Sequence, residues 1–129
     1  MKNEIKFRCF DTLQGGKYEY WDSHTNKYDG IFWEMIKNKS FKYPELNSGL
    51  KDKNGIEIYQ GDIYKKSGNI YLVEYDLLGG FHWRMIFDSW TKKNVFNSNQ
   101  RSWLSKADSN TYEIIGNINK NAELLQYAI

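Results

Sequence analysis

Short stretches of alternating residues recur along the chain and constrain its fold more than any other feature. The clearest is FHWRMIFD at residues 81–88, where one side of an extended chain would carry Phe81, Trp83, Met85 and Phe87. A period of two is typical of a β-strand. Other strand-prone stretches occupy residues 4–10, 17–21, 70–75 and 111–115. Several short strands with a turn every ~8–12 residues predict a small β-barrel.

Glycine-containing turns separate these stretches. Residues 4–21 predict a β-hairpin around the turn-rich DTLQGG, whereas residues 41–47 predict an irregular segment. Asn54 and Gly55 form the strongest hairpin signal, because both residues tolerate the positive φ of a type I′ turn. Gly61 and Asp62 mark the entry into the next strand, where Gly61 is free to take a conformation that other residues avoid.

Helical patterns are few and short. Residues 31–39 fit either a short helix or a strand, and residues 121–128 have helical propensity. Residues 90–102 are polar with scattered aromatics, which predicts a long loop or a weak strand.

Composition limits the functional classes. The net charge of +2 is too small to require a nucleic-acid partner. Cys9 is the only cysteine, so no internal disulfide can form, and a cytoplasmic location in the host cell is expected. We expect the Cys9 thiol to be a small buried hydrophobe rather than a nucleophile. No segment has the ~18 consecutive apolar residues of a membrane span.

Motifs for metal binding or catalysis are not apparent in the sequence. A calcium loop counted from Asp52 fails, because Ile56 falls at its fifth position and Glu57 at its sixth. His24 and His82 are the only conventional bases near neutral pH, and neither lies in a nucleophile motif. Carboxylates are scattered, and the sequence cannot show whether a pair meets in space. We therefore predict no catalytic site, no metal site and no cofactor.

Three motifs in order, IKFRCFD, GLKDKNGIEIYQGDIY and YEIIGNINKNAELL, resemble the YopX family of bacteriophage and prophage proteins. The resemblance spans nearly the whole chain, although residues 22–41 and 75–111 follow no family pattern. It implies a mainly β protein with a partly open, SH3-like β-barrel, a mobile-element origin and possible self-association. It implies no activity.

The expected organisation is one compact unit with two parts. Residues 1–47 would hold the N-terminal β-hairpin and a connecting segment, and residues 48–129 the SH3-like barrel with short helical segments.

The first functional hypothesis is an accessory protein that binds a host or phage macromolecule without catalysis. One form of it is modulation of a host enzyme or a defence system. Aromatic residues make up 17% of the chain, and aromatic side chains are enriched at interface cores. The candidate interface residues are Trp33, Phe41, Tyr43, Trp90, Phe96 and Trp103.

Two alternatives stay open. A nucleic-acid-binding module would combine aromatic platforms with cations, and its candidate residues are Lys51, Lys53, Lys65, Lys66, His82 and Arg84. Interleaved carboxylates oppose a strong phosphate footprint. The other alternative is a nucleotide-binding or enzymatic pocket in the barrel mouth, in which His82 or His24 would meet a carboxylate. The residues Asn54, Gly55, Gly61 and Asp62 are assigned to structural turns.

Overall fold

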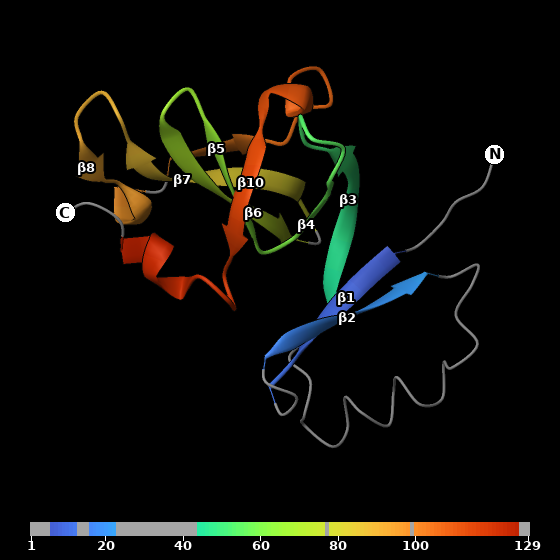
Figure 1. Cartoon of the computed structure of the whole chain (residues 1–129). Helices are drawn as coiled ribbons and strands as arrows, with labels where there is room; N and C mark the ends of the chain where they lie inside the picture. The colour runs from blue at the N-terminus through green and yellow to red at the C-terminus, as the bar shows by residue number, and fades with distance from the viewer. Residues whose placement is uncertain (1–5, 13–15, 23–43, 77, 99, 127–129) are drawn as a thin grey trace. The chain divides into compact units, whose positions relative to one another are not determined.

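The structure is a computed structural model that describes residues 6–12, 16–22, 44–76, 78–98 and 100–126 (Figure 1). Two units, Met1–Asn47 and Ser48–Ile129, divide the chain. The described residues of both units are mainly β-strand, as the sequence predicts. In the described residues no helix has the length and apolar character needed to cross a membrane.

The first unit holds the predicted N-terminal hairpin. Strand β1 (Lys6–Asp11) pairs antiparallel with β2 (Lys17–Asp22) on one side and with the start of β3 (Glu45–Lys51) on the other. The prediction of an irregular segment up to residue 47 is therefore wrong at its end. Pairing with β1 and an Arg8–Glu45 ion pair of 2.8 Å hold that segment extended.

Cys9 lies fully buried in this unit as a free thiol, as expected. Burial raises the pKa of its thiol to about 12, and the nearby Glu45 carboxylate adds to the shift. The thiol is therefore protonated near neutral pH and is a poor nucleophile.

The second unit is built around a curled sheet in the order β10-β5-β6-β7-β8, with β9 also paired to β7 (Figure 1). A curled sheet of this kind agrees with the expected partly open barrel. The strands of the unit after β3 are β4 (Glu57–Tyr59), β5 (Asp62–Lys66), β6 (Asn69–Asp76), β7 (Gly80–Asp88), β8 (Lys93–Asn94), β9 (Arg101–Trp103) and β10 (Glu113–Asn117).

Three short 3₁₀ helices complete the described structure of this unit: η1 (Phe96–Ser98), η2 (Ser109–Thr111) and η3 (Ala122–Gln126). The predicted C-terminal helical segment is thus a 3₁₀ helix. The expected helix or strand at residues 31–39 lies outside the described residues.

Both faces of the curled sheet bury apolar side chains. The first face carries a cluster of Ile58, Tyr64, Tyr71, Val73 and Tyr112, which we call the tyrosine cluster. The second face carries a cluster of Ile63, Ile70, Leu72 and Ile86, which we call the aliphatic cluster. Side chains from η1 and η3 pack against the aliphatic cluster, so these helices cover part of the second face.

A register shift in β7 corrects one sequence prediction. Ile70 pairs with Phe87 but Tyr71 pairs with Met85, so Ile86 is an extra residue in β7. A bulge of this kind breaks the alternation of faces. Phe87 consequently packs against the aliphatic cluster and not with Met85 on the first face, as the simple period predicted.

The Asp52 carboxylate organises the turn between β3 and β4. Its Oδ1 accepts hydrogen bonds of 2.9 Å from the backbone N–H groups of Asn54 and Ile56. Its Oδ2 accepts one of 3.0 Å from Ile114, on β10. Only Gly55 of the Asn54–Gly55 pair has positive φ, so the predicted type I′ turn is wrong. We attribute this to Asp52, which fixes the backbone on both sides of Gly55.

Gly61 takes the positive φ that the sequence predicts, +90°. Its N–H donates to the carbonyl of Val73 and its own carbonyl accepts from Ile118. Next to it, Oδ2 of the buried Asp62 accepts a 2.8 Å hydrogen bond from the Tyr59 N–H. The Gly61–Asp62 pair therefore closes the bend between β4 and β5.

We predict that Asp52→Ala destabilises the protein by about 2–4 kcal/mol, because three N–H donors lose their acceptor in a buried site. Urea unfolding measures the change. Lys53→Ala is the control: the Lys53 side chain is exposed and makes a surface ion pair of 3.4 Å with Glu113, while its backbone hydrogen bond to Tyr112 is kept in the variant. That change should cost no more than about 1 kcal/mol. Equal unfolding midpoints for the two variants would contradict the role of Asp52.

A second prediction concerns alkaline pH. Burial, together with the 2.9 Å hydrogen bond to Asp108, raises the pKa of Tyr112 to about 12. A phenol that ionises near pH 10 in the unfolded chain and near 12 in the folded one stabilises the fold fully below pH 10. That contribution is lost as the pH rises to about 12.

Tyr112→Phe should therefore lose less stability than the wild type between about pH 9.5 and about pH 11.5, as measured by urea unfolding at each pH. Tyr20→Phe is the control, because Tyr20 is exposed. Parallel pH profiles for wild type and Tyr112→Phe would contradict the prediction.

Candidate functional site

A row of polar side chains crosses β6, β7 and β9 on the second face of the sheet, beyond the aliphatic cluster. The register pairs Glu74 with His82, and His82 in turn with Trp103. Two residues further along β7, Arg84 lies opposite Arg101 on the same face. Residues opposite one another in a sheet share a face, so the hairpin and β9 bring these side chains together.

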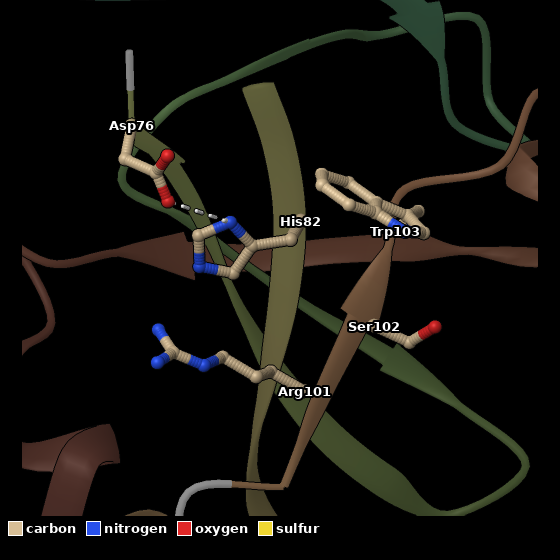
Figure 2. Close-up of a pocket in the computed structure, with 5 residues that line it drawn as sticks. All are labelled: Asp76, His82, Arg101, Ser102 and Trp103. Atoms are coloured by element: carbon tan, nitrogen blue, oxygen red, sulfur yellow. Dashed lines mark ion pairs between the residues drawn. The ribbon is translucent and has the colours of Figure 1, made fainter. Parts of the chain in front are cut away.

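His82 is the centre of this row. Its side chain is buried, and Nε2 lies 2.9 Å from Oε1 of Glu74. Because an ionised carboxylate can only accept, Nε2 donates this hydrogen bond. Nδ1, on the other side of the ring, lies 3.8 Å from Oδ2 of Asp76. The imidazole is therefore held between two carboxylates, as Figure 2 shows for Asp76.

Glu74 also holds Arg84. The Nε atom of Arg84 lies 3.2 Å from Oε1 of Glu74, and its guanidinium carbon lies 4.8 Å from the centre of the Phe96 ring. Phe96 packs in turn against the aliphatic cluster. Glu74 thus joins two basic side chains and connects the polar row to the core.

A pocket of about 310 Å³ opens over this row (Figure 2). Its lining residues are Asp76, His82, Arg101, Ser102 and Trp103. The lining combines a carboxylate, an imidazole, a guanidinium, a hydroxyl and an indole. Such a mixed set suits recognition of a ligand that carries both apolar and charged groups.

The indole of Trp103 is exposed on one side and lies close to Gly79 on the other. The residue is 63% exposed. A Cβ atom placed on Gly79 would come within 3.2 Å of Cη2 of Trp103 and within 3.0 Å of the Asp76 carboxylate. The β6–β7 turn therefore packs against the ring, and the Gly79 N–H donates to Oδ1 of Asp76. Leu78 in the same turn is fully exposed.

The predicted interface residues divide into three groups. Trp33, Phe41 and Tyr43 lie outside the described residues. Trp90 and Trp103 are exposed, at 91% and 63% respectively, whereas Phe96 is half-buried beneath Arg84.

The predicted nucleic-acid-binding cations are largely matched by carboxylates. Lys53 pairs with Glu113, and Lys66 pairs with Asp108 at 2.5 Å. That ion pair and its hydrogen bond lower the pKa of Asp108. His82 and Arg84 share Glu74, as described above. Lys51 and Lys65 are exposed.

Sequence reasoning missed Arg101, Ser102 and Leu78. The expectation of a weak strand within residues 90–102 was the available signal, because alternation there would have placed Arg101 and Trp103 on one face. His24 lies outside the described residues. Among the described residues there is no group of three or more His, Cys, Asp or Glu side chains arranged to hold a metal ion.

Comparison with known proteins finds a family model and a solved structure that match most of the chain. The model of a family described as YopX protein matches residues 6–126. Among solved structures, the chain is similar to the crystal structure of protein EF1440 from Enterococcus faecalis. The sequences are 21% identical, the TM-score is 0.48, and the match covers 94% of this chain and 97% of that one. None of the curated proteins compared with the chain matches it.

We predict that Glu74→Ala destabilises the protein by about 1–3 kcal/mol, because His82 loses its hydrogen-bond acceptor and Arg84 loses its ion-pair partner. Urea unfolding tests this. Arg101→Ala is the matched control on the neighbouring strand; Arg101 is exposed, and its loss should change stability by no more than about 0.5 kcal/mol. An unchanged midpoint for Glu74→Ala would show that the polar row does not support the fold.

Proposed function

We propose, because this chain belongs to the YopX family, that it is an accessory protein of bacteriophages and prophages that acts by binding a host or phage protein. It carries out no catalysis of its own, and it acts in the host cytoplasm. A host enzyme or a component of a defence system is the kind of partner that such a protein would modulate. Self-association is part of the same proposal.

The observation that supports binding is the exposed Trp103 indole. It is held on a paired strand and against Gly79, so little ordering entropy would be lost when a partner covers it. Arg101 and Leu78 lie close to it in the fold and are also exposed. Trp and Arg are the residue types most enriched among binding hot spots. A protein surface that covers this group would bury a tryptophan, a leucine and an arginine stem together.

A second candidate is a nucleotide or another small ligand. The pocket of about 310 Å³ and its mixed lining favour it. The buried His82 with its two carboxylates also matches the arrangement expected for a pocket of this class. A nucleic-acid partner has less support, because Lys53, Lys66 and Arg84 are paired with carboxylates.

The first proposal is tested by capture of partners from lysate of a host that carries the gene. We predict that Trp103→Ala abolishes capture of a partner that the wild type retains. Its free energy of unfolding should change by no more than about 1 kcal/mol. Trp90→Ala is the matched control, since Trp90 is even more exposed but does not line the pocket.

Capture that survives Trp103→Ala but is lost in Trp90→Ala would place the interface elsewhere. A strict monomer by light scattering that retains no host or phage protein would count against binding as a whole. Nucleotides that raise the thermal midpoint of the wild type but not of Trp103→Ala would favour the small-ligand candidate instead.

A further inference from the structure

Strand β9 pairs with β7 through the backbone groups of only one of its three residues. The register pairs His82 with Trp103, Trp83 with Ser102 and Arg84 with Arg101. On either side of these pairs, the N–H of Met85 donates to the carbonyl of Gln100 and the N–H of Leu104 donates to the carbonyl of Phe81. Hydrogen-bonded pairs alternate in an antiparallel ladder, so the bonded pair within β9 is Trp83 with Ser102.

The remaining backbone groups of β9 point away from β7. They are the N–H and C=O groups of Arg101 and Trp103. In the part of the chain that the structure describes, no strand pairs with this outer edge of β9. All three residues of the strand are exposed. An extended segment lying alongside could therefore form backbone hydrogen bonds with both residues.

The side chains at this edge define what such a segment must carry. Arg101 and Trp103 stand on the same face, two residues apart. Among the described residues no carboxylate pairs with Arg101, whereas the other basic side chain of the row, Arg84, is paired with Glu74. Asp76, the carboxylate of the pocket, lies against His82 instead. Arg101 thus offers an unmatched positive charge beside an exposed indole.

We propose that the partner docks as an extended acidic segment, which adds a strand to the outer edge of β9. The segment pairs with the backbone of Arg101 and Trp103, places an acidic side chain beside Arg101, and places an apolar side chain against Trp103 over the pocket. Side chains two residues apart on a strand share a face, so the recognised pattern is an acidic and an apolar residue at positions i and i+2.

This inference rests on the proposed protein-binding function and specifies how the partner is recognised. When a segment adds a strand to a sheet edge, the backbone bonds supply affinity and the alternate side chains supply specificity. The three-residue length of β9 limits the number of bonds, so the side-chain contacts to Arg101 and Trp103 must distinguish one segment from another.

The test uses the intact chain and an array of peptides of about nine residues, about the length of the longer natural strands. Each peptide has a Thr/Val host with one Glu and one Phe two positions apart, in both orders. A matched array carries Lys in place of Glu. Binding is measured by fluorescence anisotropy of labelled peptides. We expect the wild type to bind a Glu peptide and to prefer it at least about fivefold over its Lys counterpart.

Three further measurements test the backbone pairing and the charge recognition. Methylation of every second backbone nitrogen in the bound peptide removes the donors that would face β9 and should abolish binding. Methylation of the other nitrogens should leave it. Arg101→Glu should reverse the preference from Glu to Lys peptides by about tenfold. Backbone hydrogen exchange at Arg101 and Trp103 should slow when the peptide is bound.

The outcomes are distinct. Binding that survives both methylation patterns, or no binding by any peptide of the array, overturns strand addition. If capture of a macromolecular partner still depends on Trp103 in that case, the proposed function stands without it. Concentration-dependent self-association that is lost in Arg101→Glu, with no peptide binding, would assign the edge to a second copy of the chain and would also overturn the proposal.

Discussion

One buried carboxylate connects the parts of the second unit that lie farthest apart in sequence. Asp52 is only 4% exposed, and it accepts N–H groups from the following turn and from β10. Residue 114 is separated from it by 62 positions, so this contact ties the β3–β4 turn to β10, which is an edge strand of the curled sheet. A backbone N–H at a buried site needs an acceptor, and here a side chain supplies it where no strand can. This carboxylate therefore fixes the position of β10 at the edge of the curled sheet.

Much of the fold could be predicted from local patterns. The alternation at residues 81–88 and the turn at Gly55 act within a few positions, and the structure has a strand and a bend there. The errors occurred where a specific pairing, hydrogen bond or bulge overrode the local pattern. Pairing with β1 extended the start of β3, Asp52 kept Asn54 out of the type I′ geometry, and the extra residue in β7 moved Phe87 to the other face.

The candidate site shows the same division. His82 stood out as one of two histidines and Trp103 as a large aromatic in a polar segment, and both line the pocket. Their association could not be predicted, because it requires the register between β7 and a three-residue strand far along the chain. The sequence shows the carboxylates only as residues scattered along the chain. Only the hairpin between β6 and β7 shows that Glu74 and Asp76 lie at opposite nitrogens of one ring.

The bulge at Ile86 has a consequence for how this surface is built. It divides β7 into two segments that are offset in phase by one residue. The tip segment holds His82 and Arg84 in the polar row, and the base segment holds Phe87 against the covering C-terminal residues. One strand therefore presents the polar row at its tip and an apolar side chain to the aliphatic cluster at its base. The offset of one residue lets both face the same side of the sheet.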